Sequence, residues 1–353
     1  MEPISPCGQA VSARFGVRAT RFTKLLPGSG LSALLALAAT FVSTVHGGPQ
    51  FLYALLFGVA FHYLSHDPTS KPGIEFSART LLRFGVGLLG ARITASQIAG
   101  LGWMTAAVVV LGVVTTIGFA MLLGRRLGMT AAQRVLSGGA VAICGASAAL
   151  AISAVLPREK EGDRFTLMVV VTVTVLSTVA MIVYPLVARA LHLPPELAGL
   201  FLGGTIHDVA QVVGAGYTLG QHTGDIATVV KLFRVAMLTV VVVTIAAAFK
   251  RSRAANEQAR AESRAPAKQP LVPWFLWLFV AMVVLSSLHA FTAAMQSALN
   301  DLSRACLVTA IAALGMKTSF MQLARAGWRP MLLIVAETVW LAAFVLICAL
   351  AMR

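Results

Sequence analysis

Three polar side chains lie within the apolar stretch LFLGGTIHDVAQVVGAG at residues 200–216. If a helix continues past Gly204, then His207, Asp208 and Gln211 are three or four residues apart and share one face. A charged side chain at the centre of a membrane costs at least about 2.5 kcal/mol, so such residues normally face a cavity on the path of an ion or substrate. We expect these three side chains to bind a coupling ion, either a proton, because histidine titrates near neutral pH, or sodium. The alternative is a polar cluster that joins helices through hydrogen bonds.

A second apolar stretch, SGGAVAICGASAALAISAVLP at residues 137–157, consists mainly of small residues. A helix can unwind at its central glycine, and a broken helix offers backbone N–H groups and a positive dipole end to an anion. The glycine pair of the first stretch frees backbone groups in the same way. The residues expected to bind an anionic substrate are Cys144, Gly145, Ala146, Ser147 and Gly204. The alternative is a face of small residues that lets neighbouring helices approach closely.

Two cations, Lys231 and Arg234, lie within the apolar segment DIATVVKLFRVAML. They are three residues apart, so a helix places them on one face, and both lie too deep in the predicted span to reach water easily. We expect both to bind the anion, because arginine can make two parallel hydrogen bonds to an oxyanion. The alternative is a structural ion pair, for example with Asp208, and such a pair could open when substrate arrives.

An intramembrane enzyme and an anion channel are the other functions that these residues allow. Cys144 or Ser147 could act as a nucleophile with His207 as its base. No G-x-S-x-G, H-E-x-x-H or P-loop motif accompanies them. A channel needs a polar file along several spans, whereas these polar residues cluster at one depth. The four cysteines have neither metal-type nor disulfide-type spacing. The sequence therefore predicts a carrier that is not an enzyme and has no metal and no cofactor besides a coupling H⁺ or Na⁺.

The elements that position these residues are long apolar segments. The chain has 353 residues, of which 58% are hydrophobic and 12% are charged, whereas charged residues make up about 25% of a typical soluble domain. We predict an all-α integral membrane protein with about eleven transmembrane helices, some of them broken at glycines. The net charge of +15 falls in short segments between spans, which argues against a nucleic-acid partner. The predicted spans are 25–45, 49–64, 80–98, 102–123, 135–156, 165–188, 197–217, 226–249, 271–291, 303–321 and 330–352.

The charges of the loops predict the orientation of these spans. Four alternate loops, 45–49, 97–102, 217–224 and 291–301, contain no Lys or Arg. Excess Lys and Arg normally stay on the cytoplasmic side, so we expect a cytoplasmic N-terminus and a periplasmic C-terminus. The loop 157–164, which carries charges of both signs, falls on the outer side in this count.

The chain divides by composition into four parts and contains an internal repeat. The parts are a basic cytoplasmic tail at 1–24, eight spans at 25–249, a cytoplasmic linker at 250–270 and three spans at 271–353. LGARITASQIAGLGW at 89–103 aligns without gaps on LGMKTSFMQLARAGW at 314–328. The two copies fall in spans of opposite direction, as in secondary transporters built from inverted repeats. The two polar stretches, however, run parallel in this count, so either one of them is re-entrant or they are not symmetry mates.

Three segments resemble the bacterial YeiH family, which is described as a family of sulfate exporters. They are GGAVAICGASAALA, GGTIHDVAQVVGAG and VVKLFRV, and the resemblance covers residues 25–350. The family's Cys-Gly-x-Ser-Ala, Ile-His-acid-Val-Ala-Gln-Val and Lys-Leu-x-Arg segments fall on 144–148, 206–212 and 231–234. The resemblance implies an inner-membrane protein of ten or eleven helices, related to sodium–proton antiporters and bile-acid symporters.

Together these observations predict a secondary active transporter of the bacterial inner membrane. We expect it to export a sulfate- or sulfonate-like anion in exchange for, or together with, protons or sodium. Its partners are then a small anionic substrate and the lipid bilayer, and a homo-oligomer is compatible with the sequence. An anion channel, or an enzyme that uses Cys144 or Ser147 with His207, stays as the alternative.

Overall fold

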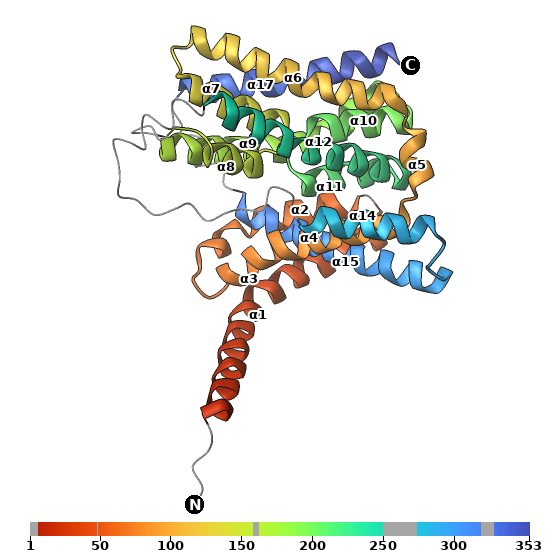
Figure 1. Ribbon diagram of the computed structural model, residues 1–353. Helices are drawn as coiled ribbons and strands as arrows, with labels where there is room; N and C mark the ends of the chain where they lie inside the picture. The colour runs from red at the N-terminus through yellow and green to blue at the C-terminus, as the bar shows by residue number, and fades with distance from the viewer. Residues whose placement is uncertain (1–5, 48, 158–161, 250–273, 319–327) are drawn as a thin grey trace, which may run out of the picture. The chain divides into compact units, whose positions relative to one another are not determined.

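The computed structural model describes residues 6–47, 49–157, 162–249, 274–318 and 328–353. These residues form helices and no strands (Figure 1), which confirms the predicted all-α class. Six of the described helices are long and apolar enough to cross a membrane, and the predicted number of about eleven stays a prediction. The chain separates into two compact units, Met1–Leu88 with Ser297–Thr318, and Leu89–Gln296 with Ser319–Arg353. The predicted linker at 250–270 lies outside the described residues, and the predicted four-part division stays a prediction.

The first unit contains the N-terminal helices and most of α15. Small residues allow close crossings here, because a Cβ atom on Gly58 would lie 2.2 Å from the backbone oxygen of Ala312. The hydroxyl of Ser303 donates to the backbone oxygen of Gly85 at 2.7 Å. The elements are α1 (Pro6–His46), α2 (Gln50–Ala60), η1 (His62–His66), α3 (Lys71–Phe76), η2 (Ser77–Leu81), α4 (Leu82–Leu89) and α15 (Ala293–Lys317).

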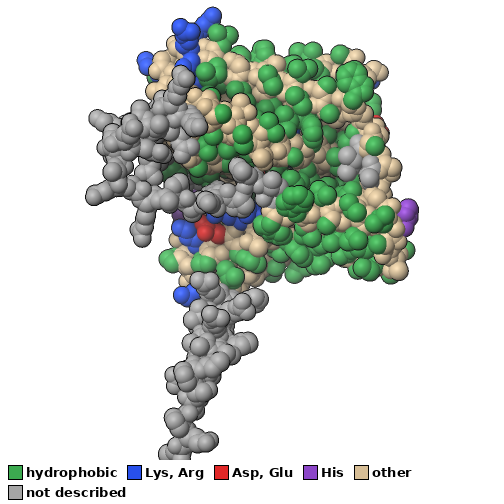
Figure 2. All heavy atoms as spheres, viewed as in Figure 1, with side chains coloured by type: hydrophobic (Ala, Val, Ile, Leu, Met, Phe, Trp, Pro, Cys, Tyr) green, Lys and Arg blue, Asp and Glu red, His purple; other side chains and the backbone are tan. Residues whose placement is uncertain are grey.

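The second unit contains both polar stretches that the sequence singles out. Apolar side chains cover the outward faces of α6 and α17 (Figure 2), among them Val114, Leu122, Val339 and Ile347. Such faces imply contact with the lipid bilayer. The elements are η3 (Gly90–Arg92), α5 (Ala95–Gly100), α6 (Gly102–Arg126), α7 (Ala131–Ala142), α8 (Ala146–Ser153), α9 (Gly162–Ala190), α10 (Pro195–Thr205), α11 (Val209–Leu219), α12 (Gln221–Ala248), α14 (Trp274–Ser287) and α17 (Trp328–Ala351).

The first polar stretch folds back on itself as a pair of helices, α7 and α8, which we call hairpin 1. A capping box between Thr130 and Gln133 begins α7, and the chain turns at Gly145, whose φ is +63°. A Cβ atom on Gly139 would lie 2.3 Å from Cδ1 of Ile152. One continuous helix would hold these two residues about 20 Å apart, so α8 lies alongside α7.

The second polar stretch, α10 and α11, also folds back, and we call it hairpin 2. Both of its helices pack on the same residue of α12. A Cβ atom on Gly203 would lie 2.4 Å from the backbone oxygen of Ala227, and one on Gly216 would lie 3.2 Å from Cβ of Ala227. The two helices therefore run side by side rather than end to end.

The two hairpins open at opposite ends of the unit. The end of α9 meets the open end of hairpin 2, because Arg189 donates to the backbone oxygen of Thr218. The C-terminal Arg353 donates to the backbone oxygen of Leu191 at this same end. Hairpin 1 opens at the other end, where Arg134 donates to the backbone oxygen of Met121. Both hairpins are thus re-entrant and opposed (Figure 1), which answers the question that the sequence left open.

This arrangement forms an inverted pair of three-part units. Along the chain, α9 follows hairpin 1 and α12 follows hairpin 2, whereas α6 precedes hairpin 1 and its counterpart α17 comes last (Figure 1). The rings of Phe119 on α6 and Trp340 on α17 stack at 4.8 Å. In the sequence repeat, Arg92 and Lys317 each end a helical segment, and α6 and α17 begin at Gly102 and Trp328. Residues 319–327 of the second copy lie outside the described residues.

The fold-back changes which loops share a side. The end of α6, with Arg125 and Arg126, and the start of α9, with Arg164, lie at the open end of hairpin 1. Arg189 lies at the opposite end. This differs from the alternation expected from eleven straight crossings, because each hairpin returns to the side from which it entered.

Candidate functional site

The tips of the two hairpins meet inside the second unit. Tip 1 consists of residues 143–145, and tip 2 consists of residues 206–208. A Cβ atom on Gly145 would lie 3.2 Å from Cβ of His207, so the glycine permits both the left-handed turn and the close approach. Cys144 and His207 are buried, whereas Asp208 is half-buried. The structure therefore brings together two stretches that lie about sixty residues apart in the sequence.

Lys231 joins the two tips. Its Nζ donates to the backbone oxygen of Ile143 at 2.7 Å and to that of Ile206 at 2.8 Å. The side chain is fully buried, so a lysine charge is held here by carbonyl dipoles rather than by water. One side chain thereby fixes the end of α7 beside the end of α10.

Arg234, one turn further along α12, binds the same two helix ends. Its Nε and Nη2 donate to the backbone oxygen of Ala142 at 3.1 and 2.7 Å. Its Nη1 donates to Gly203 at 3.2 Å and to Ile206 at 3.3 Å. The last carbonyl groups of a helix lack helical partners and carry partial negative charge. The two cations therefore cap the buried C-terminal ends of α7 and α10.

This role differs from the predicted contact of Lys231 and Arg234 with an anion. In the described part of the chain, ion pairs join Arg92 to Asp225 and Glu196 to His222, and neither pair includes these two cations. The alternative of a salt bridge with Asp208 stays a prediction. The guanidinium group of Arg234 lies beside both tips and makes the local potential favourable for an anion.

The N-terminal end of α8 follows directly on tip 1. Its N-cap residue, Gly145, has no side chain to accept a hydrogen bond, so no side chain of the N-cap residue offsets the positive potential at the start of the helix. Ala146 is half-buried and Ser147 is exposed. These are the same residues that the sequence predicts for the anion. Gly204 instead faces α17, where a Cβ atom would lie 3.1 Å from Cγ1 of Val345.

Asp208 and Gln211 tie tip 2 and α11 to α9. Asp208 is the N-cap of α11, because its Oδ1 accepts from the backbone N–H of Ala210 at 3.4 Å. Its own backbone N–H donates to Ser177 Oγ at 3.1 Å. Gln211 donates to Thr178 Oγ1 at 2.9 Å, while its Oε1 is buried without a partner. A carboxylate at this position is favoured by the positive end of α11.

His207 binds α17 rather than a nucleophile. Its Nε2 lies 3.2 Å from Thr338 Oγ1, and that hydroxyl lies 2.8 Å from the backbone oxygen of Ile334. Because the threonine proton is used on Ile334, Nε2 carries the imidazole proton and donates it. The Nδ1 atom is buried without a partner. His207 therefore contacts neither Cys144 nor Ser147 through a hydrogen bond.

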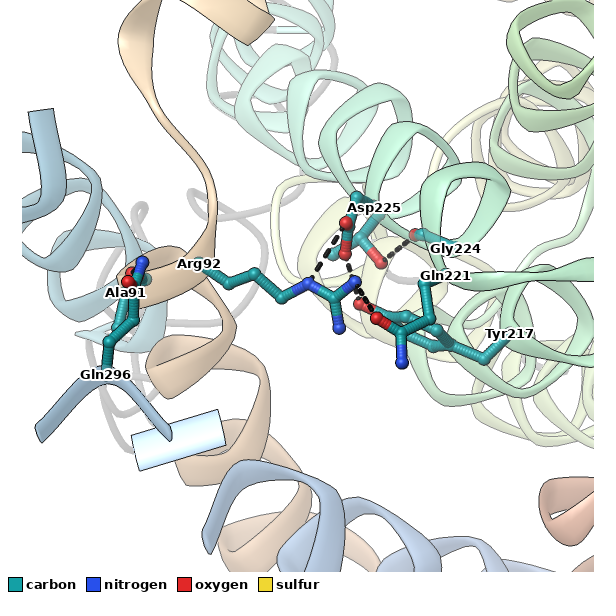
Figure 3. Close-up of polar contacts among 8 residues, drawn as sticks. Ala91, Arg92, Tyr217, Gln221, Gly224, Asp225 and Gln296 are labelled. Atoms are coloured by element: carbon teal, nitrogen blue, oxygen red, sulfur yellow. Dashed lines mark hydrogen bonds and ion pairs between the residues drawn. The ribbon is translucent and has the colours of Figure 1, made fainter. Parts of the chain in front are cut away.

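A second polar cluster, around Asp225 at the start of α12, does not follow from the sequence analysis. Arg92 Nε lies 3.2 Å from Asp225 Oδ2, and Tyr217 donates to Asp225 Oδ1 at 2.6 Å (Figure 3). Arg92 also donates to Gln221 Oε1 at 2.5 Å. The only signal in the sequence is a lone acid near the start of an apolar span. This cluster binds the connection before α6 to the open end of hairpin 2.

Comparison with known proteins places the chain in a family. The family model described as "Conserved hypothetical protein 698" matches residues 27–334. UPF0324 membrane protein CT0845 of Chlorobaculum tepidum is 47% identical over 327 residues, which is 92% of this chain and 89% of that protein. UPF0324 membrane protein TauZ of Paracoccus denitrificans is 48% identical over 322 residues, which is 91% of this chain and 94% of that protein.

More distant relatives extend the same pattern. UPF0324 membrane protein RB0971 of Rhizobium meliloti is 43% identical over 320 residues, 91% of each chain. No solved structure matches. The chain is thus a multi-pass membrane protein, and it belongs to the family described as conserved hypothetical protein 698, whose relatives carry the name UPF0324 membrane protein.

Proposed function

We propose that this protein is a secondary active transporter that exports a small sulfate- or sulfonate-like anion across the bacterial inner membrane. The observation that carries the proposal is the meeting of two opposed re-entrant hairpins at tips 1 and 2. Irregular backbone at membrane depth is tolerated only where it is buried in protein or lines a water-filled path. Inverted elements that meet at mid-membrane are typical of secondary transporters. The same observation supports membership of the sulfate exporter family and its relation to ion-coupled antiporters and symporters.

The anion binds at the N-terminal end of α8 in this proposal. Backbone N–H groups at a helix start form a ready anion site, and Ser147 adds a hydroxyl on the exposed side. Lys231 and Arg234 contribute by holding both tips and by adding two positive charges behind them. An anion therefore gains from the charge without having to displace the cations from their carbonyl partners.

The coupling ion binds at tip 2 and the start of α11. His207 Nδ1 and Gln211 Oε1 are buried atoms without partners, and each can accept a hydrogen bond or a cation. Asp208 lies between them and is half-buried. A proton would bind at the imidazole, and sodium would bind at the carboxylate and amide oxygens. No other cofactor is part of the proposal.

The charges at the two ends of the second unit support an orientation. The open end of hairpin 1 carries Arg125, Arg126 and Arg164, and the opposite end carries Arg189 and Arg353. The positive-inside rule then assigns the open end of hairpin 1 to the cytoplasm. The C-terminus lies in the periplasm in this orientation, and the N-terminus is assigned to the cytoplasm.

Two rival functions make different use of the same residues. An enzyme needs a nucleophile within hydrogen-bond reach of its base, but His207 donates to Thr338, which favours a protein that is not an enzyme. If the enzyme were correct, replacing Cys144 and Ser147 with alanine would abolish turnover. A channel would conduct without any gradient coupling and would not show exchange of bound substrate.

Uptake of radiolabelled sulfate into proteoliposomes tests the proposal. Wild type, Asp208→Asn and the exposed control Asp301→Asn are compared under imposed proton or sodium gradients. We expect one gradient to drive uptake in the wild type and the control, and the Asp208 variant to lose at least about 90% of it, because the ion no longer meets a charge.

The outcomes separate the parts of the proposal. No sulfate uptake by folded wild type under any gradient overturns sulfate as the substrate and moves the assay to organic sulfonates. Equal uptake by the Asp208 variant overturns the coupling role of Asp208. Uptake that follows the electrical potential alone, without exchange, supports a channel instead.

A further inference from the structure

Among the described residues, a buried carboxyl group outside the two tips has no cation as an ion-pair partner. Glu337 lies on α17 and is fully buried. Its Oε1 accepts a hydrogen bond from Ser137 Oγ of α7 at 2.8 Å, and its Oε2 is buried without a partner. The Ser137 hydroxyl also lies 3.2 Å from the backbone oxygen of Arg134, so its single proton is shared between two acceptors.

A second unpartnered oxygen lies at the same junction of helices. Thr116 Oγ1 of α6 is buried without a hydrogen-bond partner. Gly138, the neighbour of Ser137, packs on this part of α6, since a Cβ atom there would lie 3.7 Å from the backbone oxygen of Thr116. The junction of α6, α7 and α17 therefore contains more polar oxygen atoms than its hydrogen bonds satisfy.

In the described ranges, no charged group forms an ion pair with Glu337. The helices α6, α7, α9 and α10 pack on α17, and their described charged groups lie towards the helix ends, not beside the carboxyl. Towards the tips, the titratable side chain of His207 lies 3.2 Å from the hydroxyl of the adjacent residue Thr338. The titratable and charged groups on the packed elements are Arg125, Arg126, Arg134, Arg164, Tyr184, Arg189, Glu196 and His207.

We propose that Glu337 is a proton-binding site and that the coupling proton occupies it in addition to the site at tip 2. An ionised carboxylate with one neutral donor is very costly in an apolar interior, so the buried group holds a proton. The O–H bond forms on Oε2 with a proton taken from water, and it breaks to return that proton to water. This inference rests on the proposed transport function and names its coupling ion as the proton.

The position of Glu337 explains how a proton could act on both hairpins. Ser137, its partner, lies on hairpin 1, and Thr338, its neighbour, binds tip 2 through His207. Loss of the proton creates a charge that needs water or further donors. The contact between α7 and α17 must then open, so deprotonation and a movement of hairpin 1 occur together.

Infrared spectroscopy of the purified protein in lipid bilayers tests the site directly. A protonated carboxyl group has a carbonyl stretching band that is distinct from that of a carboxylate. We expect this band in the wild type at neutral pH, its loss in Glu337→Gln, and a shift of its frequency in Ser137→Ala, which removes the hydrogen bond to Oε1. Glu196→Gln, which removes an exposed carboxyl group, should leave the band unchanged.

The band must also titrate. As the pH is raised, a proton carrier loses the band, whereas a permanently neutral structural group keeps it until the protein unfolds. Absence of the band at neutral pH, or a band that stays constant while the fold persists, overturns the proposal. The circular dichroism of each variant reports whether it is folded, and Ser137→Ala provides the frequency shift if Glu337→Gln does not fold.

Sulfate uptake by Glu337→Gln and by the wild type distinguishes a failure of the proton site at Glu337 from a failure of the proposed transport function. Where sulfate uptake is driven by a proton gradient, Glu337→Gln should lose the driven uptake but keep exchange of internal for external sulfate. Driven uptake at the wild-type level in Glu337→Gln overturns the carrier role. Failure of the wild type to transport sulfate overturns the substrate, while the titration of the infrared band still decides whether Glu337 binds and releases a proton.

Discussion

The two buried cations of this protein donate hydrogen bonds to backbone carbonyl groups. Lys231 and Arg234 together bind carbonyl groups at the ends of α7 and α10. Two re-entrant helices that end inside a protein leave several carbonyl groups without partners, and each costs free energy if it stays unpaired. Two long cations on one helix satisfy both ends at once and neutralise their partial charges. The pair therefore makes the hairpin fold tolerable in an apolar interior.

Replacing Lys231 with methionine tests this role. The substitution keeps most of the apolar side chain but leaves the carbonyl group of Ile143 without its donor, while that of Ile206 keeps its hydrogen bond from Arg234. Since one unpaired buried group costs about 1–3 kcal/mol, we expect the free energy of unfolding to fall by about 1–3 kcal/mol. Reversible denaturation in mixed micelles measures this change, and the exposed Lys71→Met serves as the control. A loss no larger than that of the control would show that the carbonyl groups find other donors.

At the scale of elements, the hairpins depend on glycines that let backbones touch. Gly203 of α10 approaches the backbone of Ala227, and Gly139 of α7 leaves room for the side chain of Ile152. The first contact packs α10 on α12, and the second packs α8 alongside α7. A broken crossing helix and a re-entrant hairpin have the same composition, so the sequence predicts the break but not the reversal.

Gly203→Ala should weaken hairpin 2. The added Cβ atom would lie 2.4 Å from the backbone oxygen of Ala227, which cannot rotate away as a flexible side chain could. Overpacking of this kind costs about 1–3 kcal/mol, and we expect the melting temperature to fall. Gly118→Ala on α6 is the matched control, because no atom lies within 4 Å of its added Cβ, and alanine there should preserve or raise the melting temperature.

The same scale explains which site residues the sequence could predict. His207, Asp208, Lys231 and Arg234 stand out because ionisable side chains are rare in apolar segments. Their partners do not stand out, because backbone carbonyl groups occur at every residue and the hydroxyl of Thr338 is one among many. Asp225 and Arg92 also meet only in three dimensions, since they come from distant parts of the chain.

At the scale of the whole chain, the internal repeat and the two opposed hairpins belong to the same inverted repeat. The repeat precedes α6 and α17, and each of these helices packs on the first helix of a hairpin, through Gly138 with Ala120 and through Gly204 with Val345. A re-entrant hairpin does not cross the membrane. Counting it as a span therefore does not predict its direction. The repeat therefore indicates opposed units even though the predicted spans of the two polar stretches run parallel.

Labelling of single cysteines from either side of the membrane tests this topology. In a variant without the four native cysteines, Arg126→Cys and Arg164→Cys should react from the same side, because hairpin 1 returns to its side of entry. Glu196→Cys and Arg353→Cys should react from the other side, since the end of α9, the open end of hairpin 2 and the C-terminus lie together. Eleven straight crossings instead place residue 164 opposite residue 126, and residue 196 opposite residue 353. Reaction of 126 and 164 from opposite sides would therefore exclude the hairpin arrangement, and with it the meeting of the two tips on which the transport proposal rests.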